Sequence, residues 1–71
     1  MKMYKVRIFR DDRDESWEET IYHLSRAKAY IRKRAVKSMP WIQYEILSMD
    51  NELLYKVKRR GFEVEFIKES E

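Results

Sequence analysis

The residues that could perform acid–base, metal or phosphate chemistry are few in this sequence. His23 is the only histidine and no cysteine is present, so a zinc site with the usual number of ligands has no basis. The single glycine, Gly61, excludes the glycine-rich loops that bring backbone close to nucleotide phosphates. We expect His23 on the solvent side of a helix, where pairing with Glu19 explains it without catalysis. The sequence therefore predicts no catalytic residue, no metal site and no cofactor.

An acidic run at 11–15 and five serines are the remaining candidates for chemistry. The run lacks the glycine and the terminal bidentate glutamate of an EF-hand loop, and Arg13 interrupts it. A solvated loop that leads into a helix N-terminus explains it better. No serine stands in the G-x-S-x-G pattern of a nucleophile elbow. We therefore expect a protein that is not an enzyme.

The first half of the chain contains signals for one strand and one helix. Tyr4, Val6 and Ile8 alternate with charged residues, which predicts a strand with one buried face. Ser16 can cap a helix, because Glu19 stands three residues later as in a capping box. The apolar residues that recur at helical spacing behind this cap are Trp17, Ile21, Leu24, Ile31 and Ala35. We expect a long helix that begins after Ser16 and ends before Pro40.

Three strand-like runs follow Pro40, at 41–48, 53–59 and 62–68. Asp50-Asn51 and Arg60-Gly61 separate these runs and are suitable tight turns. With these dipeptides as turn centres, the apolar pairs are Ile46–Tyr55, Tyr44–Val57, Leu47–Leu54, Tyr55–Phe66, Val57–Val64 and Leu54–Ile67. The charged pairs on the other face are Glu45–Lys56, Lys56–Glu65 and Lys58–Glu63. One register thus satisfies both the apolar face and the charged face.

A chain of 71 residues has room for one hydrophobic core, so residues 1–71 are expected to form a single compact α/β binding domain. We predict an α+β fold of β-α-β-β-β order, with one helix packed on one face of a four-stranded mixed sheet. The strand order 2-3-4-1 is favoured, because it brings Lys5 and Arg7 near Glu63 and Glu65. The order 1-2-3-4 is the alternative.

Charged residues occur along the whole chain, and they bear on its location and its partners. No apolar run approaches the length of a membrane span, and residues 1–7 carry charges where a signal peptide needs an apolar region. We expect a cytoplasmic protein with no membrane partner. The net charge of +3 conceals a separation, because acids dominate 11–19 and six bases without an acid occupy 26–37. This order is the one that a helix macrodipole favours.

Two surfaces are candidates for binding a partner. The first is the outer face of the helix, because tyrosine and arginine are enriched at interface hot spots. We assign partner binding there to Tyr22, Arg26, Tyr30, Lys33, Arg34 and Lys37. The second is the sheet face away from the helix, where an apolar row could form a homodimer or a second contact. That row consists of Leu47, Leu54 and Ile67.

These surfaces favour a small protein-binding inhibitor or adaptor of a larger machine, including machines that handle nucleic acid. Small viral proteins that block host defence, such as anti-CRISPR proteins, are of this chain type. The alternative is a nucleic-acid-binding protein, in which the six bases of 26–37 meet phosphates and Tyr30 stacks on a base. RNA recognition on the sheet face is disfavoured, because Glu63 and Glu65 would repel phosphates. A protein partner is therefore the first expectation and nucleic acid the second.

Overall fold

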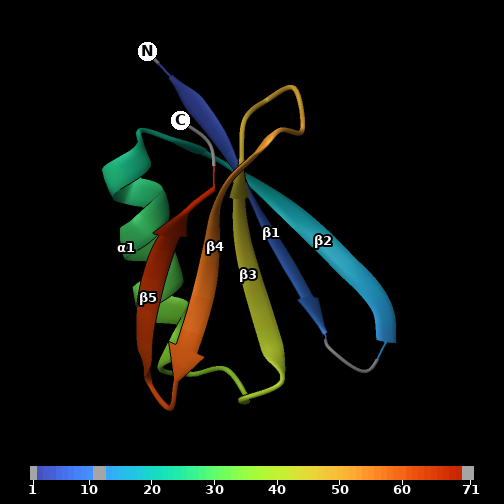
Figure 1. Ribbon diagram of the computed structural model, residues 1–71, viewed down its shortest axis with the longest axis vertical. Helices are drawn as coiled ribbons and strands as arrows, with labels where there is room; N and C mark the ends of the chain where they lie inside the picture. The colour runs from blue at the N-terminus through green and yellow to red at the C-terminus, as the bar shows by residue number, and fades with distance from the viewer. Residues whose placement is uncertain (1, 11–12, 70–71) are drawn as a thin grey trace.

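The structure is a computed structural model that describes residues 2–10 and 13–69. Its elements follow in the order β1 (Met3–Arg10), β2 (Arg13–Tyr22), α1 (Leu24–Ala35), β3 (Ile42–Leu47), β4 (Leu53–Arg60) and β5 (Glu63–Lys68). The strands form one sheet in the order β2-β1-β3-β4-β5, and each neighbouring pair is antiparallel. The helix α1 lies on one side of this sheet (Figure 1). The predicted α+β fold with one helix is confirmed.

The segment before α1 is a strand, so the prediction that the helix begins after Ser16 is wrong. Strand β2 pairs with β1, which places Trp17 opposite Ile8. A spacing of four residues keeps side chains on one face of a strand as well as on one face of a helix. The apolar residues Trp17 and Ile21 therefore do not distinguish the two structures. Pairing with β1 stabilises the strand form of this segment, because it also sets Glu18 opposite Arg7.

The sheet has five antiparallel strands among the described residues, where four strands in a mixed sheet were predicted. Strand β1 lies between β2 and β3, so it is not at an edge, and the favoured order 2-3-4-1 is wrong. The four predicted strands correspond to β1, β3, β4 and β5, which are neighbours in that order. The alternative order 1-2-3-4 therefore holds for these four strands, with β2 added beside β1. The missed strand is the cause, because β2 forms a hairpin with β1 and takes the edge itself. The helix α1 then connects this edge strand to β3, which pairs with the other side of β1.

The hydrophobic core lies between α1 and one face of the sheet. Its buried side chains are Val6, Ile8, Ala27, Ile31, Ala35, Tyr44, Ile46 and Val57. The three helix residues in this set repeat every four positions, which gives α1 one apolar stripe. The C-terminal half of the predicted stripe is thereby confirmed, and Leu24 packs against the core in a partly buried position. Full burial of a side chain such as Ile31 stabilises the fold by about 1.5–3 kcal/mol.

The hairpin of β3 and β4 has the predicted register over part of its length. Glu45 lies opposite Lys56 and Ile46 lies opposite Tyr55, as expected. An irregularity follows, so Leu47 lies opposite Leu53 and the predicted pair of Leu47 with Leu54 does not form.

The hairpin of β4 and β5 keeps the predicted faces in a different register. Lys58 lies opposite Glu65 where Glu63 was expected, and Val57 lies opposite Phe66. The pair of Arg60 with Glu63 closes the hairpin, so the turn is centred one residue later, on Gly61 and Phe62. The φ of +62° at Gly61 is one that glycine adopts without strain. A shift of two residues leaves every side chain on its predicted face.

Candidate functional site

The six residues predicted to bind a partner do not share one surface. Tyr22 is the last residue of β2 and is 47% exposed. Tyr30 packs against the core, and its hydroxyl accepts a hydrogen bond from Arg34 Nη1 at 3.3 Å. Neither tyrosine therefore lies on the solvent-exposed outer face of α1. The exposed members that remain on α1 and its following turn are Arg26, Lys33 and Lys37.

These three residues, which we call the cationic ridge, lie on one line along the outer side of α1. Successive helical residues turn by about 100°, so positions 26, 33 and 37 fall within about 20° of one direction. Lys37 follows the end of α1, but the helical turn continues, because its N–H donates to the Arg34 carbonyl at 3.0 Å. At about 1.5 Å per residue the line is about 16 Å long. The three side chains have no polar or ring contact with the described part of the chain.

Three further cations flank the cationic ridge and stack on aromatic rings. Lys28 and Arg32 lie over the ring of Phe66, at 5.5 and 5.1 Å from its centroid. On the other side Arg34 lies 5.5 Å from the ring of Trp17. An aromatic ring attracts a cation without neutralising its charge. The helix side therefore presents six positive charges, of which three are held in place by rings.

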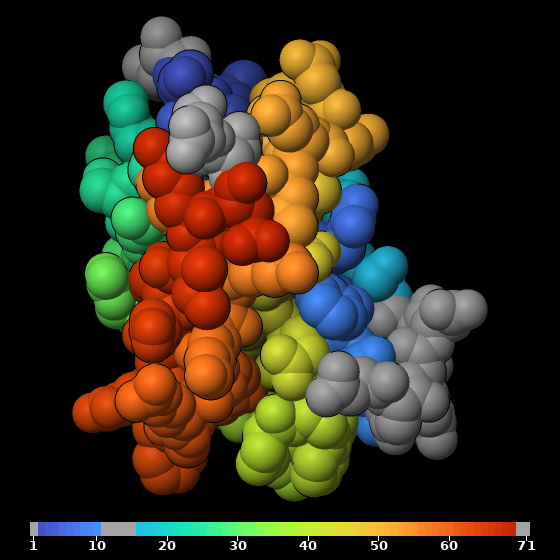
Figure 2. Space-filling view, viewed as in Figure 1, coloured from blue at the N-terminus to red at the C-terminus, as the bar shows by residue number. Residues whose placement is uncertain are grey.

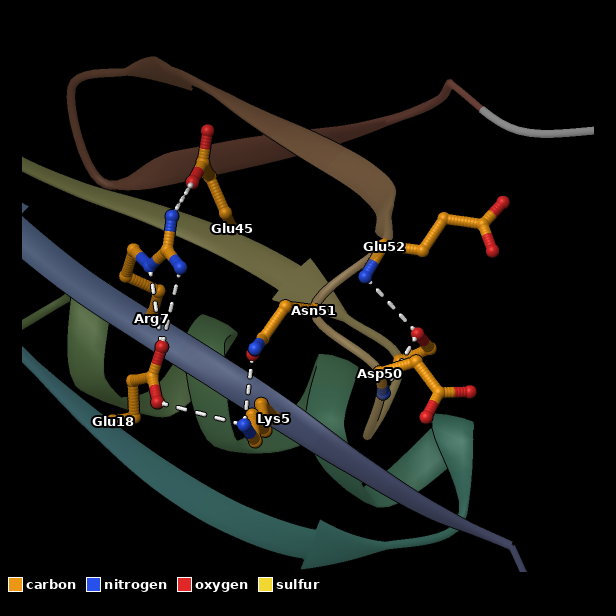
Figure 3. A network of polar contacts seen from close by, with 8 residues as sticks. Lys5, Arg7, Glu18, Glu45, Asp50, Asn51 and Glu52 are labelled. Atoms are coloured by element: carbon orange, nitrogen blue, oxygen red, sulfur yellow. Dashed lines mark hydrogen bonds and ion pairs between the residues drawn. The ribbon is translucent and has the colours of Figure 1, made fainter.

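On the sheet face away from α1, cations form ion pairs with carboxylates (Figure 3). Arg7 lies between two acids, with 3.3 Å from Nη2 to Glu18 Oε2 and 3.5 Å from Nη1 to Glu45 Oε1. Lys5 Nζ lies 3.9 Å from Glu18 and donates to Asn51 Oδ1 at 2.8 Å. The hairpin of β1 and β2 positions this network, since Arg7 and Glu18 are opposite each other. Its charges largely offset one another.

The same pairing extends across β4 and β5, whose side chains cover much of the face seen in Figure 2. Lys56 Nζ lies 3.5 Å from Glu69 Oε1, and Arg60 Nη2 lies 3.7 Å from Glu65 Oε1. Such exposed pairs contribute at most about 1 kcal/mol each to stability. They nevertheless lower the net positive charge of this face, in contrast to the helix side.

The second predicted surface, the apolar row of Leu47, Leu54 and Ile67, does not form as expected. Leu47 is only 2% exposed, so a partner has little of it to contact. Ile67 lies opposite Lys56 and is not opposite Leu54. The row is therefore broken by a charged residue. A homodimer through these residues stays a prediction.

A different group of apolar side chains is exposed at the end of the molecule where α1 stops. The group comprises Val36, Met39, Trp41 and Phe62, which are 56%, 56%, 42% and 71% exposed; we call it the end patch. Single exposed apolar residues are common on protein surfaces, whereas a group gathered at one place indicates an interaction site. Three members belong to the connection between α1 and β3, and Phe62 lies in the turn between β4 and β5 (Figure 1).

Arg59 holds together the two segments that carry the end patch. Its Nη1 donates to the carbonyls of Met39 at 2.7 Å and Ile42 at 3.2 Å. Its Nη2 lies 2.7, 3.3 and 3.2 Å from the carbonyl oxygens of Ala35, Ser38 and Gly61. Each residue of the end patch either supplies one of these carbonyls or is the chain neighbour of a residue that does. One guanidinium group therefore fixes the spacing of the four apolar side chains.

An open hollow borders the end patch on the sheet side. Its lining consists of Pro40, Gln43, Lys56, Val57, Lys58, Arg59 and Ile67. Pro40 stands between two residues of the end patch, and Arg59 is the residue that supports the patch. The hollow therefore lies beside the end patch, and Lys56 and Lys58 are part of its lining.

The end patch was not predicted from the sequence, although a signal for it exists. Turns and connections are usually polar, and apolar residues at Met39, Trp41 and Phe62 are unusual there. The contact between the two connections is not visible in the sequence, because it depends on Arg59 reaching carbonyls about 20 positions earlier in the chain. Only the fold brings the three residues to one end.

Neither searches for other kinds of site nor comparisons with known proteins identify what the end patch binds. Within the described residues no group of three or more histidine, aspartate or glutamate side chains is placed to hold a metal ion. No described helix is long and apolar enough to cross a membrane. The chain matches no protein-family model, no curated protein and no solved structure. A function has to be argued from the end patch and the cationic ridge themselves.

Proposed function

We propose that this chain is a small, non-enzymatic protein-binding module that acts as an inhibitor or adaptor, and that its partner binds the end patch. The observation that carries this proposal is the exposure of four large apolar side chains on segments that one arginine holds together. We propose a cytoplasmic location for it.

The end patch has the composition of a protein-binding hot spot. Tryptophan is among the residues that dominate interface energies, and methionine and phenylalanine are enriched at interfaces. Its support matters as well, because a surface whose backbone is already ordered loses little conformational entropy on binding. Phe62 is the most exposed member and follows the turn glycine, so a partner can enclose it. We expect Phe62 and Trp41 to contribute most of the binding free energy.

Photo-crosslinking tests this proposal, because it captures whichever protein contacts the chosen side chain. A photoreactive phenylalanine analogue replaces Phe62 in one variant and Met49 in a control, since Met49 is also exposed, at 43%, but lies in the turn between β3 and β4. Both proteins are irradiated in nuclease-treated lysate. We expect a specific protein adduct from position 62 that position 49 does not give.

Binding of the captured protein is then measured with purified components. Phe62→Ser should weaken the affinity at least about 30-fold, which corresponds to the loss of about 2 kcal/mol typical of a hot-spot residue. Met49→Ser should leave the affinity unchanged. Circular dichroism confirms that both variants remain folded. Identical adducts from the two positions, or equal affinities of the two serine variants, would show that the end patch is not the binding site.

A further inference from the structure

We propose that the cationic ridge, Arg26, Lys33 and Lys37, binds the phosphate backbone of a double-stranded nucleic acid without regard to sequence. This inference goes beyond the protein-binding function and does not depend on it, because the ridge and the end patch share no residue.

Most of the unbalanced positive charge among the described residues lies on the helix side. Residues 24–38 contain six of the 16 lysine and arginine residues and no acid, so the rest of the chain has ten bases against 13 acids. On the sheet, Lys5, Arg7, Lys56 and Arg60 each form an ion pair. None of the six cations of 24–38 forms an ion pair with a described residue. An anionic polymer would therefore be attracted to α1 more strongly than to the sheet.

The shape of the cationic ridge fits a regular array of charges. Its length of about 16 Å corresponds to a stretch of duplex that carries roughly ten phosphates on its two strands, one per about 1.7 Å of helix axis. Ala29 lies exposed on the same outer side of α1, and its small side chain leaves room for close approach. The stacked cations Lys28, Arg32 and Arg34 stand on either side of the line and retain their charge.

Two observations favour a duplex over other anionic partners. Single-stranded nucleic acid is bound by exposed aromatic rings on which bases stack, but the rings that flank the cationic ridge, Phe66 and Trp17, are stacked against the chain's own cations. An acidic protein would be expected to bury a large apolar anchor among the charges, whereas Ala29 is the exposed apolar residue of α1 between Arg26 and Lys33. Contacts made only to phosphates fix the position of a protein on a duplex but do not select a sequence.

Fluorescence anisotropy with a labelled 24-base-pair DNA duplex of random sequence tests the proposal. We compare the parent with the ridge variant Arg26→Gln/Lys33→Gln/Lys37→Gln. The matched control, Lys56→Gln/Lys58→Gln/Arg60→Gln, removes the same number of charges from exposed positions on the sheet face. The Phe62→Ser variant separates this site from the end patch. Circular dichroism establishes that each variant is folded.

We expect the parent to bind with a dissociation constant of about 1–10 µM at 50 mM NaCl, in the range of non-specific binding. Three phosphate contacts give a slope of about −2.7 in log K against log salt, so 200 mM NaCl should weaken binding about 40-fold. The ridge variant should bind at least about tenfold more weakly at 50 mM and lose most of this salt dependence. The sheet control and Phe62→Ser should stay within about threefold of the parent.

Several results would overturn the proposal. The parent not binding the duplex at 50 mM NaCl would exclude it directly. Equal losses in the ridge variant and the sheet control would mean that net charge alone attracts DNA. Tighter binding to a single strand of the same length would contradict the duplex geometry. Equally tight binding to polyglutamate would show that the cationic ridge accepts an acidic polypeptide, in which case a protein partner would replace nucleic acid as the inferred ligand.

Discussion

Replacement of Arg59 by leucine tests how the end of the molecule is held together. In the parent, the two terminal nitrogens of Arg59 lie within 3.3 Å of five backbone carbonyl oxygens. These carbonyls come from the end of α1, from the connection to β3, from the first residue of β3 and from the turn after β4. Leucine keeps an apolar stem of similar width but donates no hydrogen bond.

The expected loss follows from the geometry of the guanidinium group. Nη1 and Nη2 together have four N–H groups for five acceptors, so at least one N–H is shared and four full hydrogen bonds are the upper limit. Water can hydrate part of the carbonyls when Arg59 is removed, which lowers the contribution of each bond to about 0.5–1 kcal/mol. We therefore expect Arg59→Leu to lower the free energy of unfolding by about 2–4 kcal/mol. A domain of this length has a total of only about 4–10 kcal/mol.

Urea and thermal unfolding followed by circular dichroism measure this change. A loss of about 2–4 kcal/mol should lower the melting temperature by roughly 10–25 °C in so small a domain. Arg60→Leu is the matched control, because Arg60 is the next residue and forms only an exposed pair with Glu65; it should cost less than about 0.5 kcal/mol. If both variants unfold at the same urea concentration, the contacts of Arg59 do not hold the end of the domain.

Two other predictions concern single features of the fold. A double-mutant cycle in which Lys58 and Glu65 are replaced by alanine, followed by urea unfolding, should give a coupling energy of about 0.2–1 kcal/mol. The same cycle with Lys58 and Glu63 should give a smaller coupling energy. A larger coupling energy for Lys58 with Glu63 would support the register predicted from the sequence. His23 precedes α1 with φ of 69° and ψ of 135°, a strained backbone for a residue with a side chain. His23→Gly should therefore raise the free energy of unfolding by about 1 kcal/mol, and a loss of stability in the same assay would contradict that strain.

The parts of the fold that were predicted correctly are those in which only one periodicity fits. Tyr4, Val6 and Ile8 are spaced by two residues, which fits a strand and does not fit a helix. Ile31 and Ala35 belong to a segment whose other residues favour a helix. The segment at 16–22 fits both patterns, since Trp17 and Ile21 are four residues apart. The capping signal at Ser16 favours a helix, whereas the segment forms a strand that pairs with β1. Contacts across this hairpin stabilise the strand, and local sequence preferences do not contain that information.

The candidate sites were predictable to different degrees. The basic side chains of α1 were found because exposed lysine and arginine follow from helical periodicity alone. Tyr30 was placed with them, but it packs against the core from the edge of the buried stripe. The end patch could not be derived in this way, since it joins residues from two connections. Its geometry depends on a long side chain that bridges them, and loop geometry has no periodic signal.

The position of β2 changes the explanation of the charge pattern. Had 16–22 formed the first turns of the helix, its acids would lie at the positive end of the macrodipole and account for the separation of charge. Instead Glu18 lies on the sheet face beside Lys5 and Arg7, and the first turn of α1 contains no acid. The bases in the last turn of α1 still agree with the macrodipole. The macrodipole therefore explains only one end of the helix.

Arg26 is the member of the cationic ridge that helix stability does not explain. It stands near the positive end of the macrodipole, where a cation costs about 0.3–1 kcal/mol, and no described residue offsets its charge. Arg26→Gln should therefore raise the free energy of unfolding by a few tenths of a kcal/mol while weakening duplex binding. Lys33→Gln lies in the last turn and should weaken binding with a small loss of stability instead. Urea unfolding and anisotropy on the two single variants measure both quantities. If both variants change the free energy of unfolding in the same direction, the macrodipole does not govern stability at these positions. If Arg26→Gln binds the duplex as tightly as the parent, Arg26 is not part of the binding surface.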